Sequence, residues 1–437
     1  MPPLNVLYIH SHDTGTYIQP YGHAIPTPNL QRLAEQGVLF RNAFTTNPTC
    51  SPSRAALLTG QYPHENGMFG LAHRGFYLDD PSRHLANHLA RNGYHTVLAG
   101  VQHVAHGKEA VEAIDYRERH RDHQGAIAFL RDAPKQPFFL AVGFMETHRA
   151  APPNQEDFFR DVDPLDARYV RPPDPLPDTP ETRDDLARYA ASARTLDRKM
   201  GQVFDALDEA GLAENTLVIC TTDHGIAFPR MKCNLEDDGT HVMLMLRGPG
   251  PFSGGKVVDA LVSQLDLYPT VCALAGIDPP NGLRGTSLVP LVAGEVEELH
   301  DTLFAEVNYH CAFEPIRSAR TTRWKYVRRF EPAPGPILCN TDRSPSKALW
   351  IKHGWPTMAP AREALYDLVF DPHERDNLAD SPGHTAVLED MRARLDVFMQ
   401  ATGDPAGGEG VPMRPRWRAN RTTDVDPQDP MLPPGQR

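Results

Sequence analysis

The sequence LNVLYIHSHDTG, residues 4–15, joins an apolar, β-prone run to a polar cluster that ends in glycine. Its first six residues are almost all apolar, which predicts a strand buried on both faces, as in a parallel sheet. Open parallel sheets bind ligands beyond the carboxyl ends of their strands. We therefore expect His12 and Asp13 to lie at the functional edge of such a sheet.

The same alternation of apolar runs and helical patterns continues along the chain for roughly 290 residues, which predicts an α/β fold with a large, mainly parallel sheet between layers of helices. The expected strands are 4–9, 38–44, 96–99, 138–142, 216–221 and 242–246, and the expected helices are 28–36, 84–92, 123–131, 181–211 and 265–275.

The pattern changes near residue 300. Residues 302–309, 315–330 and 364–370 are β-prone, and 384–401 is helical, so we expect a smaller α+β subdomain. The segment after residue 402 is rich in proline, glycine, arginine and aspartate and predicts an irregular or partly disordered tail. The expected division is 1–300, 301–402 and 403–437.

The composition excludes several classes of protein. With 40% hydrophobic and 23% charged residues the 437-residue chain is globular, and its net charge of -12 argues against nucleic-acid binding. We find no signal-like start and no long apolar segment, so we expect no membrane partner. The six cysteines show no CxxC pair, which suits a reducing compartment, and we predict a cytoplasmic protein.

A second polar cluster follows the predicted strand 216–221. It reads Asp223-His224-Gly225, and it resembles the His12-Asp13 cluster after the first strand. Either cluster alone is compatible with a capped turn. Together the two predict a divalent-cation site, because carboxylates and imidazoles from neighbouring strand ends converge.

The stretch TCSPSRAALLTG, residues 49–60, places a cysteine at the start of a predicted helix that ends at Gly60. Amide groups and the helix dipole stabilise negative charge there, which predicts a Cys50 thiol with a lowered pKa. Cys50 therefore looks like a nucleophile, although the chain lacks the sequence signature of a cysteine protease.

The residues Cys50-Ser-Pro-Ser-Arg54 followed by Leu58-Thr59-Gly60 resemble the signature of the type I sulfatases, which belong to the alkaline phosphatase superfamily. The segments ENTLVICTTDHGIAFP, VSQLDLYPTVCALAGI and LYDLVFDPHERDNLA also look like sulfatase segments. The resemblance covers about residues 4–400 and is greatest to the heparan N-sulfatase (sulfamidase) branch. It implies an alkaline-phosphatase-like fold.

The resemblance implies that a formylglycine-generating enzyme oxidises Cys50 to formylglycine. Asp13, Asp223 and the modified Cys50 match the positions that hold one divalent cation, which is Ca²⁺ by resemblance. His12 and His224 stand where the sulfamidase pattern has Asp and Asn. They would either bind the cation directly or orient its ligands, and direct binding by imidazole would favour Mn²⁺ or Zn²⁺.

The resemblance also assigns roles around the nucleophile. Arg54 would hold the formylglycine diol and offset its charge, and His148 would bind the sulfate and protonate the leaving group. Lys232 matches a basic position that grips the transferred group. For His148 and Lys232 the alternatives are an ordinary polar residue at a strand end and a solvated lysine.

One departure from the family pattern concerns the run Gly-Lys-x-His, which here reads Gly100-Val-Gln-His103. His103 is kept as a catalytic candidate, but Val101 replaces the lysine. Gln102 or Lys108 is expected to take over its contact with substrate, and His241 is the third expected substrate-binding residue.

Three functions compete. The first is a sulfatase acting on a sulfate ester or an N-sulfonated amino sugar. The second is a phosphonate monoester or phosphodiester hydrolase of the same superfamily, which the missing lysine favours because fewer cations face the transferred group. The third is a non-catalytic binding protein, which the intact motif around Cys50 argues against. A homo-oligomer is compatible with the sequence.

Overall fold

The computed structural model describes residues 4–132 and 134–437. Its main sheet contains β1 (Asn5–His10), β2 (Val38–Phe44), β3 (His95–Gly100), β4 (Glu118–His120), β5 (Phe138–Gly143), β6 (Thr216–Thr221), β7 (Leu244–Arg247) and β8 (Lys256–Ser263). They lie in the order β4, β3, β5, β1, β6, β7, β2, β8.

β1 runs through the centre of this sheet and pairs in parallel with β5 and β6. Its last residue, His10, aligns with Gly143 of β5 and Thr221 of β6, so the polar clusters after β1 and β6 meet at one edge. Within this sheet, β7 pairs antiparallel with β6 and β2, and all other described strand pairs are parallel. The predicted α/β fold with a mainly parallel sheet is confirmed.

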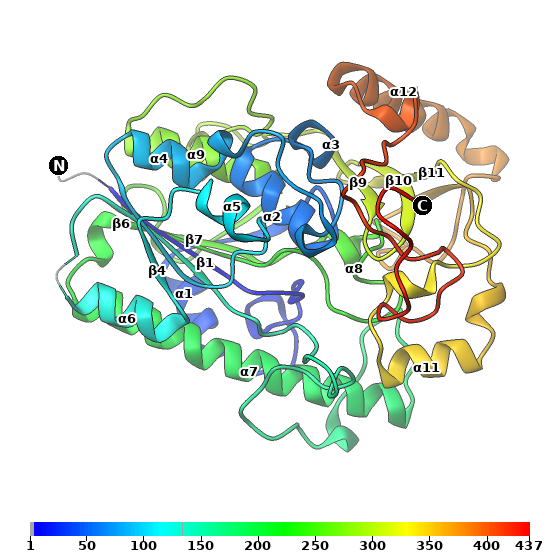
Figure 1. Cartoon of the computed structure of the whole chain (residues 1–437), viewed down its shortest axis with the longest axis horizontal. Coiled ribbons are helices and arrows are strands. Elements are labelled where there is room, and N and C mark those ends of the chain that lie inside the picture. Colours follow the sequence, from blue (N-terminus) through cyan, green and yellow to red (C-terminus); the bar gives the residue numbers. More distant parts are fainter. Residues whose placement is uncertain (1–3, 133) are drawn as a thin grey trace.

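Helices cover both faces of the sheet (Figure 1). Val6 and Tyr8 of β1 pack into one apolar cluster, and Leu7 and Ile9 pack into the other, because successive strand residues point to opposite faces. The first face carries α2 (Cys50–Thr59), α4 (Leu85–Arg91) and α9 (Leu267–Ala275), and the second carries α1 (Pro28–Gln36), α6 (His123–Arg131) and α7 (Pro180–Glu209). Shorter helices are α3 (Pro63–Asn66), α5 (Lys108–Glu112), α8 (Asp237–Thr240) and α10 (Val289–Ala293).

A second, antiparallel sheet forms the C-terminal subdomain, at the far end of the molecule from the N-terminus (Figure 1). It contains β9 (Leu303–Tyr309), β10 (Phe313–Arg320), β11 (Trp324–Arg329) and β12 (Glu363–Asp367), with α11 (Pro345–Lys352) in the β11–β12 connection and α12 (Thr385–Thr402) packed on the sheet. The predicted α+β subdomain is confirmed, and the boundaries at residues 300 and 402 stay predictions.

The β-prone segment 315–330 forms two strands, β10 and β11, joined by a hairpin turn that the sequence analysis did not mark. This turn contains no glycine or proline. Instead the Thr321 hydroxyl accepts hydrogen bonds from the amides of Arg323 and Trp324. The sequence interpretation also missed β4, β8 and α11.

The segment after α12 is irregular, apart from a single turn at Pro405–Gly407, and it returns to the main domain. Trp417 is fully buried and stacks on Phe76, with ring centroids 4.4 Å apart. The Arg418 amide donates to the Arg74 carbonyl, and Arg74 Nη1 donates to Asn420 Oδ1 at 2.7 Å. The tail is therefore part of the folded core.

None of the helices described is both long and apolar enough to cross a bilayer. All six cysteines lie within the described residues, and each is a buried free thiol.

Candidate active site

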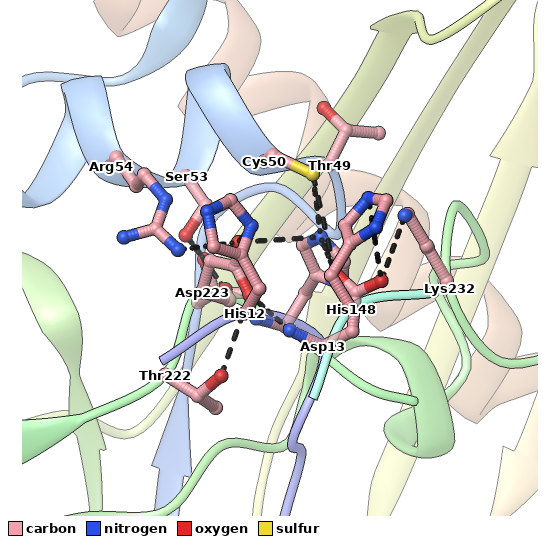
Figure 2. Close-up of polar contacts among 12 residues, drawn as sticks. His12, Asp13, Thr49, Cys50, Ser53, Arg54, His148, Thr222, Asp223 and Lys232 are labelled. Atoms are coloured by element: carbon pink, nitrogen blue, oxygen red, sulfur yellow. Dashed lines mark hydrogen bonds and ion pairs between the residues drawn. The ribbon is translucent and has the colours of Figure 1, made fainter. Parts of the chain in front are cut away.

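Cys50 is the first residue of α2, and its side chain is buried. Figure 2 shows its sulfur pointing from the helix toward Asp13. Thr49 precedes it in extended conformation, and Gly60 ends the helix with a positive φ of 67°. The Cys50 Sγ lies 4.0 Å from Asp13 Oδ1 and 3.4 Å from His224 Nε2. The three sequence stretches singled out above therefore meet around one sulfur atom.

Asp13 and Asp223 bring their carboxylates together from the two strand ends. The Asp13 amide donates to Asp223 Oδ1 at 2.8 Å, and Asp13 itself has a positive φ of 51°. The two loops approach closely, since a Cβ at Gly15 would meet Gly225 Cα at 3.2 Å. Burial would raise the pKa of Asp223, but His224, Arg54 and His12 outweigh it and lower that pKa well below its usual range.

The donor set around these carboxylates fits a divalent cation. His12, Asp13, Cys50 and Asp223 each offer one ligand atom within 4.8 Å of the others. The His12 ring faces Asp223 through Nδ1, 3.3 Å from Oδ2, whereas its Nε2 is shielded from solvent without a hydrogen-bond partner. An unpaired buried polar atom costs free energy that a bound cation would offset. His224 hydrogen-bonds the Gly225 carbonyl through Nδ1 at 3.0 Å, which leaves Nε2 toward Cys50.

Arg54 lies one turn into α2, with its guanidinium behind the carboxylates. Its Nη2 donates to the Ser11 carbonyl at 2.6 Å and to Asp223 Oδ2 at 2.9 Å, while Nη1 contacts His10 Nδ1. The side chain is almost completely buried, so its charge acts at low dielectric. Arg54 is thus placed to balance negative charge at the Cys50 position.

Lys232 approaches Asp13 from the opposite side (Figure 2). Its Nζ lies 2.9 Å from Asp13 Oδ2 and 2.9 Å from Asp342 Oδ2. Burial favours the neutral amine, but Asp13 and Asp342 outweigh burial and raise the pKa of Lys232 well above its usual value. The sequence alternative of a solvated lysine is therefore wrong.

The more exposed side of the cluster carries three histidines, His73, His103 and His148. His148 Nε2 lies 3.9 Å from Asp13 Oδ2, and the side chain is partly exposed. His103 stacks on His73, with Nε2 3.2 Å from His73 Nδ1, and its ring centroid lies 5.6 Å from that of His12. The structure therefore brings His103 and His148 together with Cys50, as the sequence led us to expect.

The expected lowered pKa of the Cys50 thiol is wrong. Burial raises this pKa well above its ordinary value, and Asp13 and Asp223 add to the shift, whereas Lys232 and Arg54 oppose it. The start of a helix lowers a thiol pKa, but here the loss of hydration at the sulfur and the two nearby carboxylates raise the Cys50 pKa by more. An unmodified Cys50 is thus a protonated thiol rather than a reactive thiolate.

The three expected substrate-binding residues do not join the cluster. Gln102 bonds within its own loop, to the Ala105 carbonyl and to the amides of residues 104 and 105. The side chain of Lys108 is 88% exposed on α5. His241 bonds the Arg41 carbonyl and stacks on a phenylalanine of β2.

Sequence reasoning missed Asp342 and His310. Asp342 pairs with Lys232, and His310 Nδ1 is buried without a hydrogen-bond partner. Both belong to the segment 310–345, which carries no motif of its own. Only their position in the folded chain reveals them.

Two family models match the chain. The sulfatase model matches residues 4–277, and a model described as the C-terminal region of N-sulphoglucosamine sulphohydrolase matches residues 230–346. Together they cover the Cys50 cluster and all of the first three strands of the second sheet.

Known proteins agree with these matches. Human N-sulphoglucosamine sulphohydrolase is 33% identical over 92% of this chain and 91% of its own length. A putative sulfatase structure from Bacteroides thetaiotaomicron superimposes with a TM-score of 0.71 at 22% identity, covering 98% of this chain and 100% of that one. A phosphonate monoester hydrolase from Silicibacter pomeroyi gives a TM-score of 0.66 at 20% identity, covering 95% and 100%. The fold is alkaline-phosphatase-like.

Proposed function

The chain belongs to the sulfatase family, and we propose that it is a metal-dependent formylglycine sulfatase that hydrolyses a sulfate ester or the N-sulfonate of an amino sugar. The observation that carries this proposal is the position of Cys50, buried at the start of α2 between Asp13, Asp223 and His224. A protonated thiol at that position is a poor nucleophile. The proposal therefore includes conversion of Cys50 to formylglycine by a formylglycine-generating enzyme.

We propose that Asp13, Asp223, His12 and His224 hold one divalent cation with the converted Cys50. The unpaired Nε2 of His12 supports imidazole ligation, and two imidazoles favour Mn²⁺ or Zn²⁺ over Ca²⁺. When bound, the cation and the hydrated aldehyde supply a nucleophilic oxygen and charge neutralisation at sulfur. Elemental analysis of the purified protein tests this: calcium alone would contradict selection by the histidines.

The protein's own residues position the transferred group. Arg54 offsets negative charge from within α2, and Lys232 does so from the opposite side. His148 is partly exposed beside Asp13, where its Nε2 can deliver a proton to the departing nitrogen or oxygen. The His103 ring lies beside that of His12, with centroids 5.6 Å apart, on the same side of the site.

The second candidate is a phosphonate monoester or phosphodiester hydrolase. Asp13 and Asp342 together balance the charge of Lys232, so the site presents few free cations and suits a singly charged group on either sulfur or phosphorus. Parallel assays of an aryl sulfate, a glucosamine N-sulfate and an aryl phosphonate separate the two functions. Turnover of the phosphonate alone would replace the first proposal by the second.

The Cys50 peptide tests the modification directly. Mass spectrometry of protein produced with the generating enzyme should find this peptide about 18 Da lighter than its thiol form. An entirely unmodified thiol would refute the nucleophile assignment. We also propose a cytoplasmic location, which the six free thiols support; cell fractionation tests it.

A further inference from the structure

A cavity of about 270 Å³ lies between the loop after β6 and the C-terminal subdomain. Arg230, Cys233, Asn234 and Glu236 line it from the loop, and Asn340 and Thr341 line it from the subdomain. The same two segments supply Lys232 and Asp342 to the candidate active site. The cavity and the active site therefore share their walls.

Aromatic rings enclose part of this cavity. Trp350 and Trp355 meet edge to face, with centroids 5.5 Å apart and ring planes at 62°, and Tyr366 also lines the cavity. The indole Nε1 of Trp350 is shielded from solvent and has no hydrogen-bond partner. Aromatic faces and a free N–H donor suit a flat ring with apolar C–H faces and polar edges.

Two charges in the cavity lack partners within the described part of the chain. Glu236 Oε2 is buried and unpaired. Arg230 lines the cavity without a described hydrogen bond or ion pair. By contrast, Arg329 is neutralised by Glu314 at 2.8 Å. The cavity thus offers one free cation and one free acceptor.

The backbone of this wall is strained. Arg230 has a φ of 64° and Cys233 a φ of 67°, on either side of Lys232. Such conformations cost about 1–3 kcal/mol each in residues other than glycine, and they gather at functional sites. They turn Arg230 and Cys233 toward the cavity while Lys232 reaches Asp13.

We propose that this cavity binds a single pyranose unit that carries an acidic group. The acidic group pairs with Arg230, a ring hydroxyl donates to Glu236, and the sugar faces pack on the two tryptophans. The volume is slightly below the roughly 300–1,000 Å³ of most ligand pockets, which suits one ring rather than a chain. The inference rests on the proposed function only in taking saccharides as the molecules the enzyme meets.

Tryptophan fluorescence of the full-length thiol form tests the proposal, because two of the four tryptophans of the chain line the cavity. Glucuronic acid should change the emission saturably, and uncharged glucose should bind at least about tenfold more weakly, a difference of about 1.4 kcal/mol. Arg230→Gln should weaken glucuronic acid binding by the same factor and leave glucose binding unchanged. Trp324→Phe, in β11, should keep the signal, and Trp355→Phe should reduce it.

Arg121→Gln, in the exposed loop before α6, is the matched control and should bind like the unchanged protein. If Arg230→Gln fails to fold, Glu236→Gln replaces it and should weaken binding of both sugars. The absence of saturable binding, or equal affinity for both sugars, would overturn the proposal. Turnover is not needed, so a negative substrate panel with intact glucuronic acid binding rejects the proposed function and keeps this site.

Discussion

Replacing Lys232 by methionine tests the electrostatic balance of the candidate active site. The Lys232 side chain is 2% exposed and its ammonium lies 2.9 Å from Asp13, which is fully buried, and 2.9 Å from Asp342, which is 16% exposed. Methionine keeps most of the volume and removes the charge. Two carboxylates then face each other without a cation.

Removing one partner of a buried pair costs about 3–5 kcal/mol, because the other charge stays buried and unpaired. We expect Lys232→Met to lower the free energy of unfolding by about 3 kcal/mol, since Asp342 is partly solvated. Adding Asp342→Asn removes one of the two unpaired charges. The double variant should recover about 1–2 kcal/mol, within the range measured for residues in contact.

Urea unfolding of the four proteins of this cycle gives the coupling energy. Lys199→Met is the control, because Lys199 pairs with Glu146 at 2.6 Å elsewhere, and Asp342→Asn should not rescue it. If Asp342→Asn fails to recover stability in Lys232→Met, the two side chains are not coupled and the inferred charge balance is wrong. In the converted enzyme, Lys232→Met should also lower kcat/KM by about 10²–10³.

Three further predictions concern Asp238, Trp417 and His148. Burial raises the pKa of Asp238 to about 6 from 3.8, so the folded state binds the proton more tightly and loses stability as the pH rises from about 4 to about 6. Asp238→Asn keeps an acceptor for the Tyr17 hydroxyl. Chemical denaturation should find this variant about 1–3 kcal/mol more stable than the unchanged protein at pH 8 and no more stable at pH 4. A gain of equal size at both pH values would contradict the raised pKa. Trp417→Ala should cost about 3–5 kcal/mol in thermal or urea unfolding, and a change below about 1 kcal/mol would show that the tail does not complete the core. His148→Ala should reduce kcat about 10²–10⁴-fold for a sugar sulfate and far less for an aryl sulfate, whose leaving group needs no proton; equal losses would exclude His148 as the acid.

The strands of the main sheet were predictable because their apolar runs are buried on both faces. Residues 4–9, 138–142 and 216–221 match β1, β5 and β6 within one residue. β8 was missed because Lys256 and Asp259 interrupt its apolar residues and its first half is largely exposed, so it lacks the continuous apolar run that marks the central strands. The strand order was also beyond the sequence, since it depends on which strands meet after long crossovers.

The residues of the candidate site were predictable where they belong to short sequence motifs. Asp13, Cys50 and Asp223 lie together because parallel strands end at one edge. Asp342 was not predictable, because its role depends on a contact with Lys232 between two sheets. The lowered pKa expected for Cys50 failed for a related reason, since burial of the sulfur beside carboxylates is a property of the fold rather than of the motif.

The buried tail imposes an order on events during synthesis. Trp417 covers Phe69 and Phe76, and the neighbouring Ala72 amide is bonded to Ser51 Oγ, next to Cys50. The ribosome makes this cover after every strand of both sheets. The packing beside Ser51 is therefore completed only after the rest of the chain has been made, so the proposed conversion of Cys50 would meet a less enclosed sulfur atom before this stage than after it.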